Sequence, residues 1–360
     1  MDVIQKESYF DQGIFDAEVE AIFKKEWLLA GLTTSIKNKR DWLTIELFGQ
    51  SIILYNTGAE IKAFQNVCPH RFNKIFTEPA GNGPMLCTYH LWAFNENGEV
   101  IGKKNVTPEP QSAPCLKTYP IEVVGSFIFI NLLASPQHTL QAQLGAEIID
   151  ELRYYSEVIF ENVYEVDMEH NCNWKFIVEN TIELHHCAAL HKNTLLRAGI
   201  CAVAPSAQNT LNRNSFFILP VASKEMDKKR SYITNALFGK DRIVPMYKHT
   251  FIYPNTLIGN IEGVNIHIGT LVPVSPDKTM FKMHYFLARP DSDNEALFSE
   301  FKRISKDFSL KVFGEDKAVL ERVQEGVKQI EHNGYQYTSE QRVGWFVAAY
   351  NNSMNNNGIN

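Results

Sequence analysis

Cysteine is scarce in this sequence, which contains six cysteines in 360 residues. The N-terminal segment also lacks the basic and then apolar layout of an export signal, so a disulfide framework is not expected. The longest apolar runs, such as Ser126–Ala134, are too short to cross a bilayer. We therefore expect a cytoplasmic protein with no membrane segment, whose cysteines are ligands or buried apolar residues.

Blocks of like charge are also missing. The 35 basic and 41 acidic residues give a net charge of −6 and are spread along the chain, so no nucleic-acid partner is expected. The sequence has no glycine-rich dinucleotide fingerprint and no flavin motif, which argues against direct binding of NAD(P)H. The chain is 360 residues long, which is more than one hydrophobic core usually supports, so we expect two domains or one large domain with an insertion. Its 44% of hydrophobic residues is enough to fill such cores.

The hydrophobic pattern changes along the chain. Apolar residues recur at helical spacing between Phe15 and Trp27 and predict an amphipathic N-terminal helix. Short β-branched and aromatic runs between Trp42 and about Leu133, separated by Gly, Asn and Pro, predict a compact antiparallel β unit. Further helices are predicted over 140–152, 174–191, 294–330 and 339–351, and further strands over 216–287. A small β domain therefore interrupts a larger α+β domain.

Four potential metal ligands form two pairs, Cys68-x-His70 and Cys87-x-x-His90, with sixteen residues between the pairs. Two thiolates and two imidazoles can hold a metal centre. A structural zinc site is one interpretation, and four unrelated core residues another, but zinc ligand pairs usually join Cys with Cys and His with His. One residue of each kind on each loop favours a [2Fe–2S] cluster in which two Cys hold one iron and two His hold the other.

A second group of potential ligands lies in the segment NWKFIVENTIELHHCAALHKNT, which contains His185, His186 and His191. Residues five apart lie about 140° apart around a regular helix, so His186 and His191 can share a metal only if the helix bends or breaks between them. The alternative is a helix with ordinary surface histidines. Two His and one carboxylate leave positions open for O₂ and form the ligand set of non-haem Fe(II) oxygenases.

Asp316 is the downstream acid that best fits the carboxylate position. It lies in the apolar stripe of its predicted helix, where a carboxylate is costly unless it is paired or bound to metal. Glu315 and Glu321 have more polar surroundings. A buried salt bridge is the alternative role for Asp316.

The first motif and its β-rich host resemble the Rieske domain of the Rieske non-haem iron oxygenases, the α subunits of ring-hydroxylating and related enzymes. The pattern Glu-x-x-His-x₄-His is similar to the iron motif of this family, and the resemblance extends through HTFIYPNTLIGN to GYQYTSEQRVGWF. It places iron ligands at His186, His191 and Asp316 and leaves His185 outside. One departure is the segment HRFN, where many relatives have His-Arg-Gly.

The resemblance implies an α+β fold in which a β-rich Rieske [2Fe–2S] domain, residues 38–140, is inserted into a helix-grip catalytic domain, residues 1–37 and 141–360. In the helix grip an antiparallel sheet curls over a long helix beside a mononuclear Fe(II). Glu183 matches the acid that, in the family, bridges the cluster of one subunit to the iron of its neighbour, which implies a head-to-tail homotrimer. Asn180 matches a family Asn near the iron.

The implied function is a terminal oxygenase component that uses O₂ to hydroxylate a small organic substrate. Its electrons would come from a separate flavin and iron–sulfur reductase, with NAD(P)H as an indirect donor. Many relatives have Asp at the position of Glu183. A Glu at this position is similar to the choline- and carnitine-type monooxygenases, and this similarity favours an N-methyl or quaternary ammonium substrate. Aromatic ring or methyl hydroxylation is an alternative. A Rieske electron-transfer protein without oxygenase activity is the alternative from another class, and a zinc hydrolase leaves the cluster motif unexplained.

Overall fold

The computed structural model describes residues 3–103, 114–221 and 228–355. Contacts within the chain divide it into two compact units, a larger one made of Met1–Ile22 and Gln143–Asn360, and an inserted one made of Phe23–Ala142. The inserted unit begins at Phe23 rather than at residue 38, because strand β1 (Leu28–Leu32) pairs with β10 (Phe127–Ile130) inside it. Among the described residues, no helix combines the length and apolar character needed to cross a bilayer.

The inserted unit consists of short strands arranged in three sheets, with the orders β5-β2-β3-β4-β8, β1-β10-β9 and β6-β7. Its remaining strands are β2 (Asp41–Leu47), β3 (Gln50–Asn56), β4 (Ile61–Gln65), β5 (Ala80–Asn82), β6 (Trp92–Phe94), β7 (Val100–Lys103), β8 (Thr118–Tyr119) and β9 (Ile121–Val124). Cys68 and Cys87, each 1% exposed, belong to the hydrophobic core of this unit. The two predicted ligand loops are therefore anchored in the core by their cysteines.

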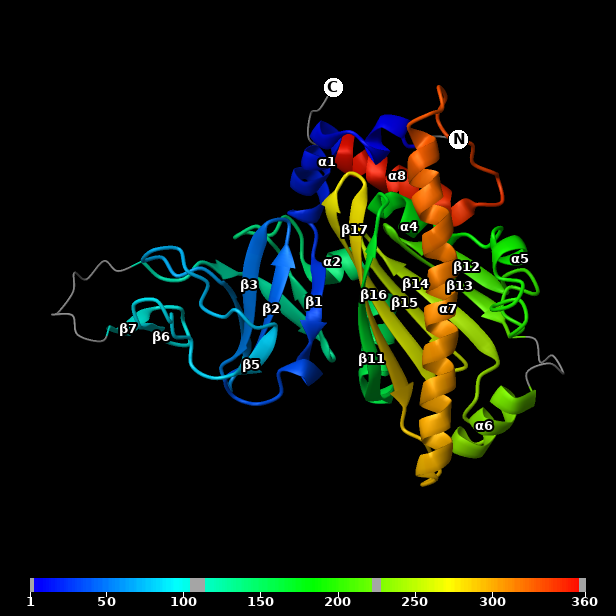
Figure 1. The fold of residues 1–360 in the computed structure, drawn as a ribbon, viewed down its shortest axis with the longest axis horizontal. Helices are drawn as coiled ribbons and strands as arrows, with labels where there is room; N and C mark the ends of the chain where they lie inside the picture. Colours follow the sequence, from blue (N-terminus) through cyan, green and yellow to red (C-terminus); the bar gives the residue numbers. More distant parts are fainter. Residues whose placement is uncertain (1–2, 104–113, 222–227, 356–360) are drawn as a thin grey trace. The chain divides into compact units, whose positions relative to one another are not determined.

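The larger unit is built on a seven-stranded antiparallel sheet with the order β11-β17-β16-β15-β14-β13-β12. Its strands are β11 (Ile159–His170), β12 (Ala207–Leu211), β13 (Asn214–Pro220), β14 (Met246–Ile252), β15 (Thr256–Ile261), β16 (Asn265–Ser275) and β17 (Lys278–Ala288). Its main helices are α3 (Ala146–Val158), α4 (Trp174–Ile182), α5 (Cys187–Leu190), α6 (Lys228–Phe238), α7 (Glu295–Val327) and α8 (Gln341–Asn355), while α2 (Leu140–Leu144) spans the boundary between the units. The long helix α7 runs across the strands of the sheet (Figure 1). The predicted fold class, α+β with an antiparallel sheet and a long helix, is confirmed.

Helix α7 packs on the sheet through its apolar stripe. The Asn294 side chain caps its first turn by accepting a hydrogen bond from the Leu297 amide at 3.0 Å. Phe298 and Phe301 then pack in one core with residues of β17 such as Tyr285. The amphipathic repeat in the sequence therefore locates α7 within one to three residues of its predicted ends.

The N-terminal helix is shorter than predicted. It comprises α1 (Gln12–Glu18), which a π-helical turn, η2 (Val19–Phe23), continues. Trp27 lies beyond the helix, directly before β1, and is buried. The apolar spacing that extends to Trp27 thus reflects burial in two different elements.

A fully buried ion pair joins three distant segments of the larger unit. Lys175 on α4 donates to Glu18 on α1 at 2.5 Å, and neither side chain is exposed. Glu18 also accepts hydrogen bonds from the Trp174 indole at 2.9 Å and from the Tyr350 hydroxyl of α8 at 2.6 Å. Because a buried charge is costly without such partners, this cluster ties α1, α4 and α8 together.

Candidate metal centres

The two loops of the first centre share one backbone turn. In each loop, the residue four positions after the cysteine donates its amide hydrogen to the cysteine carbonyl, from Phe72 to Cys68 and from Leu91 to Cys87, both at 2.9 Å. Phe72 and Leu91 both adopt positive φ, at 61° and 58°. The departure HRFN therefore places a phenylalanine where the backbone favours glycine, at a cost of about 1–2 kcal/mol.

The four predicted cluster residues lie together at these loops. The thiols of Cys68 and Cys87 are in hydrogen-bond contact. The imidazole rings of His70 and His90 have centroids 4.6 Å apart, and His70 stacks on Trp92 at 4.7 Å. The sulfurs are buried in the core, and His90 is exposed. The arrangement brings two sulfur atoms and two imidazole rings together, as potential ligands of one metal centre.

Hydrogen-bond donors surround both sulfurs. Backbone amides of His70 and of the following residue approach Cys68, and backbone amides of Tyr89 and His90 approach Cys87. Burial raises the pKa of the Cys68 thiol. Burial also raises the pKa of Cys87, but these amides, the Cys68 thiol and the Asn73 side chain, 3.7 Å from its sulfur, together outweigh burial and lower the pKa overall. The donors favour charged sulfur, so the residues present fit an iron–sulfur cluster.

The second centre is formed where the predicted helix over 174–191 breaks. Helix α4 ends at Ile182, and Glu183 has an extended backbone with φ −108° and ψ 168°. The chain then forms the short helix α5, with His186 at its N-cap and His191 at its C-cap. The break satisfies the condition under which these two histidines can share a metal.

The structure brings His186, His191 and Asp316 together. One ligand atom from each side chain lies within 4.8 Å of the other two. Nε2 of His191 is 3.1 Å from Oδ1 of Asp316, and Nε2 of His186 is 3.7 Å from the same oxygen. Asn180, on α4, donates a hydrogen bond from Nδ2 to that oxygen at 3.1 Å. His185 points elsewhere, with its Nε2 3.1 Å from the hydroxyl of Ser339.

A carboxylate holds the far nitrogen of each histidine. Glu183 accepts a hydrogen bond from Nδ1 of His186, and Glu315 accepts one from Nδ1 of His191 at 2.8 Å. Since a carboxylate only accepts, Nδ1 of each ring carries the hydrogen and Nε2 is left for a metal. Burial lowers the pKa of His191, but hydrogen bonds to Asp316 and Glu315 outweigh it and raise the pKa to about 9. These acids favour positive charge at this place, so the site fits a divalent iron.

Glu315, which the sequence interpretation set aside, contacts the group of candidate ligands. Its Oε2 accepts hydrogen bonds from His191 and from the Thr194 hydroxyl, the latter at 2.7 Å. We expect Glu315→Gln to weaken iron binding about 10–100-fold, because the amide can no longer hold His191 as a carboxylate does. Iron retained during dialysis against a graded chelator measures this effect. Glu321→Gln, a change on the same helix, is the control, and equal iron retention in both variants would contradict the role of Glu315.

An inner cavity of about 80 Å³ adjoins the side chains of His186, His191 and Asp316. Aromatic rings contributed by the sheet and by α7 line it, namely Phe217, Tyr247, His249, His267, Phe281 and Phe313. Two glycines make room for these rings. A Cβ on Gly259 would lie 1.9 Å from the ring of His267, and one on Gly269 would lie 2.4 Å from the ring of Phe281. Sequence reasoning did not identify these rings, because the register that aligns the strands is not visible in one sequence.

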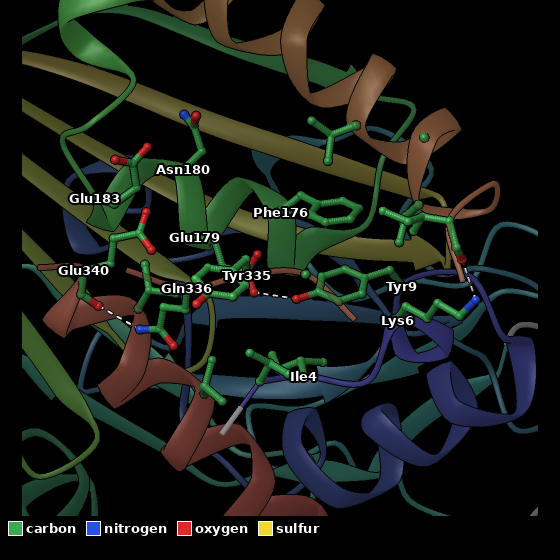
Figure 2. A pocket seen from close by; sticks show the side chains of 18 of the residues that line it. Ile4, Lys6, Tyr9, Phe176, Glu179, Asn180, Glu183, Tyr335, Gln336 and Glu340 are labelled. Carbon is green, nitrogen blue, oxygen red and sulfur yellow. Dashed lines mark hydrogen bonds between the residues drawn. The ribbon is translucent and has the colours of Figure 1, made fainter. Parts of the chain in front are cut away.

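A larger outer cavity of about 550 Å³ adjoins α4 as well, and Phe176, Glu179 and Asn180 of this helix are among its lining residues (Figure 2). Asn180 and Glu183 line both cavities. Tyr9 donates a hydrogen bond to Glu179 across the outer cavity at 2.6 Å (Figure 2). Glu183 therefore contacts the histidine of the inner site and is also reached from the outer cavity.

Glu179 makes stability depend on pH. Burial raises its pKa from 4.5 to about 7, opposed by the Tyr9 hydrogen bond and the Lys175 charge and assisted by Glu340. Because its pKa is higher in the folded than in the unfolded state, protonated Glu179 adds to the free energy of unfolding. This contribution is fully present below about pH 4.5 and is lost as the pH rises through 7. Glu179→Gln, which mimics the protonated acid, should match the wild type at pH 4 and exceed its unfolding free energy by about 1–3 kcal/mol at pH 8. Urea unfolding at each pH measures the difference. Glu325→Gln, at an exposed position on α7, is the control. The prediction would be contradicted if the unfolding free energies of wild type and Glu179→Gln changed in parallel with pH.

Comparison with known families gives two matches. The family "Ring hydroxylating alpha subunit (catalytic domain)" matches residues 159–356, and the family "Rieske [2Fe-2S] domain" matches residues 26–120. The chain is 30% identical over 196 residues to the glycine betaine monooxygenase oxygenase subunit of Pseudomonas aeruginosa, covering 52% of this chain and 44% of that protein. It is 29% identical over 191 residues to the carnitine monooxygenase oxygenase subunit of Escherichia coli, covering 51% and 50%. The alignments thus span about half the length of these relatives.

Among solved structures, the fold is similar to the quaternary ammonium Rieske monooxygenase CntA in complex with L-carnitine. The TM-score is 0.79 at 18% sequence identity, and the match covers 97% of this chain and 95% of that chain. At this identity the likeness concerns the fold.

Proposed function

The chain belongs to the family of ring-hydroxylating α subunits, and from this premise we propose that it is the terminal oxygenase component of a multi-component system. In this family the Rieske domain binds a [2Fe–2S] cluster and the catalytic domain binds a mononuclear iron ion. We assign the cluster to Cys68, His70, Cys87 and His90, and the iron to His186, His191 and Asp316. The observation that carries the proposal is the meeting of the last three side chains, each with its own supporting partner.

The chain's own residues have three tasks at the iron site. When bound, the cluster supplies single electrons and the iron supplies the chemistry that activates O₂. Glu183 orients His186 through Nδ1, and Asn180 holds one oxygen of Asp316. The aromatic wall of the inner cavity excludes water from the place where the substrate reacts.

The proposed substrate is a small N-methyl or quaternary ammonium compound. The similar proteins are named for glycine betaine and carnitine. Glu183 in place of the more frequent Asp supports the same class. Phe281 and Phe313 meet edge to face, with ring centroids 5.8 Å apart, and the aromatic rings of this cavity can attract an ammonium head group. Hydroxylation of an N-methyl group would release the methyl carbon as an aldehyde.

The proposed partners are a separate flavin and iron–sulfur reductase and two further copies of the chain. Glu183 faces the outer cavity as well as His186, so a group outside the unit can reach it. A head-to-tail trimer would let the cluster of one copy approach Glu183 of the next, because a closed ring repeats one such contact.

The test of function is product formation. The protein would be incubated with NADH, a surrogate reductase and O₂, together with glycine betaine, carnitine, choline or an aromatic panel, and products read by mass spectrometry. We expect loss of a methyl group with formaldehyde release from an ammonium compound. If oxygen were added only to aromatic compounds, the proposed substrate class would change to aromatic compounds. If no compound gave a product, the result would favour an electron-transfer protein without oxygenase activity.

The metal content gives an independent prediction. Anaerobically prepared protein should contain about three irons per chain, two in a cluster with labile sulfide and one mononuclear. Iron and sulfide analysis with visible absorption measures this content. Stoichiometric zinc without Rieske-type absorption would contradict both metal assignments.

A further inference from the structure

Arg342 is a buried cation on the last helix of the larger unit. It lies on α8 and is 2% exposed. Its guanidinium donates to the Ser215 hydroxyl and carbonyl, both at 3.0 Å, and approaches Nδ1 of His249 at 3.3 Å. Within the described part of the chain, no acid forms an ion pair with it. Burial lowers the pKa of Arg342 to about 9, which still leaves it charged at neutral pH, and buried charges are normally paired.

The contact with Arg342 sets the hydrogen position on His249. A guanidinium has no acceptor, so Nδ1 of His249 must accept from it, and the single ring hydrogen of the neutral imidazole lies on Nε2. Burial and the Arg342 charge hold the pKa of His249 well below its usual value. His249 is 3% exposed, lines the inner cavity, and has no further hydrogen-bond partner among the described residues. Its free N–H group is therefore a donor available to a molecule in the cavity.

The position of His249 in the sheet gives this donor a direction. Across neighbouring strands, Phe217, His249, Gly259 and His267 are directly paired in one row. Gly259 carries no side chain, and the ring of His267 occupies the space above it. The row belongs to the sheet, whereas His191 caps the end of α5 and Asp316 lies on α7. The cavity thus has acidic groups at its helical side and a donor backed by a positive charge at its sheet side.

We propose that His249, supported by Arg342, binds the carboxylate of the substrate, so that the inner cavity selects small zwitterions that carry both a methylated ammonium group and a carboxylate. This inference rests on the proposed function for the ammonium part and on the Arg342–His249 pair for the carboxylate part. The carboxylate supplies the negative charge that Arg342 lacks. The ammonium end then lies toward the acidic, iron-binding side, where an N-methyl group has to be oxidised.

Four isosteric compounds separate the two parts. Glycine betaine has an ammonium and a carboxylate, choline an ammonium and a hydroxyl, 3,3-dimethylbutyrate only a carboxylate, and 3,3-dimethylbutan-1-ol only a hydroxyl. Binding to the anaerobic, iron-loaded protein without reductant would be measured by calorimetry, so that no turnover occurs. We expect each carboxylate to bind at least about tenfold more tightly than its hydroxyl partner, equivalent to about 1.4 kcal/mol.

The same four affinities distinguish failure of this inference from failure of the proposed function. Equal binding of glycine betaine and choline, or no binding of either carboxylate, would overturn the carboxylate site. A carboxylate preference without any preference for the ammonium compounds would leave His249 in its role and reject the quaternary ammonium substrate. The first result tests recognition of the substrate's carboxylate, and the second tests recognition of its ammonium group.

Two substitutions locate the preference. His249→Phe keeps a ring against Phe217, whose centroid is 5.3 Å away, but removes the donor, and should bring the carboxylate preference close to one. His267→Phe makes the same change on β16 in the same cavity, where no described arginine contacts the ring, and should keep the preference. If His249→Phe does not fold, Arg342→Gln serves instead and should reduce the preference to about threefold or less. Retention of a tenfold preference in the first or third variant, with an unchanged melting temperature, would refute the proposal.

Discussion

Replacing His186 by alanine is expected to reduce product formation by more than about 100-fold while the cluster remains visible and reducible. The two centres share no residue, and the imidazole of His186 is one of three side chains that meet at the proposed iron. Loss of a group that merely supports a metal ligand costs about 10–100-fold, so loss of a ligand should cost more. Product mass and the visible spectrum before and after chemical reduction measure both parts of the result.

His185→Ala is the matched control for this variant. His185 is the adjacent histidine and is exposed, and its Nε2 contacts Ser339 rather than the iron-binding groups. The control should retain most of the activity. Cys87→Ser should have the opposite spectral effect, with loss of the cluster and retention of mononuclear iron. Wild-type turnover in His186→Ala would show that the iron assignment is wrong.

Replacing Glu183 by glutamine is expected to leave both metal sites filled and to slow electron transfer between them by about 10–100-fold. The amide keeps the size of the side chain but loses the charge that holds His186 through Nδ1. It also replaces one of the two accepting oxygens by an NH₂ group, so it can no longer accept from His186 and from a cluster histidine of a neighbouring copy through two separate oxygens. Single-turnover kinetics, starting from a pre-reduced cluster with substrate and O₂, measures the rate of cluster oxidation.

Glu340→Gln is the control for Glu183, because Glu340 also lines the outer cavity but lies on the segment that leads into α8. An ordinary helix acid would cost less than about 0.5 kcal/mol in stability when neutralised and would not change the rate. An unaltered rate of cluster oxidation in Glu183→Gln would remove Glu183 from the electron path. The same result would also count against contact between Glu183 and the cluster of a neighbouring copy.

Much of both centres was predictable from sequence because their ligands are close together in the chain. Cys68, His70, Cys87 and His90 lie on two short loops, and the spacing alone brings each pair together. Asp316 is far from the histidines in the sequence, but it was identified because a carboxylate in an apolar helical stripe is costly unless it is paired or bound to metal. The structure places it beside His186 and His191. The assignments of these residues as ligands remain predictions for the metal analysis to test.

The residues that sequence reasoning missed depend on tertiary contacts. Glu315 was set aside for its polar sequence neighbours, yet it turns toward His191 and Thr194. His249 was missed because its significance comes from Arg342, 93 positions away in the chain. The helix break after Ile182 was stated only as a condition, since nothing in the composition of that segment requires it. Local pattern predicts elements, whereas the partners of a side chain require the packed structure.

The buried pair of Glu18 and Lys175 has a consequence for the order of events during synthesis. Tyr350, which donates a hydrogen bond to Glu18, lies on α8 far downstream of the inserted unit, so the larger unit cannot complete these buried contacts until α8 has been synthesised. The inserted unit, Phe23–Ala142, is continuous in sequence and emerges whole much earlier. Domains generally fold as units in the order in which they are made. The Cys68–His90 segment is therefore ready to receive its cluster while the iron-binding unit still awaits α7 and α8, and the two metals can be delivered at separate times.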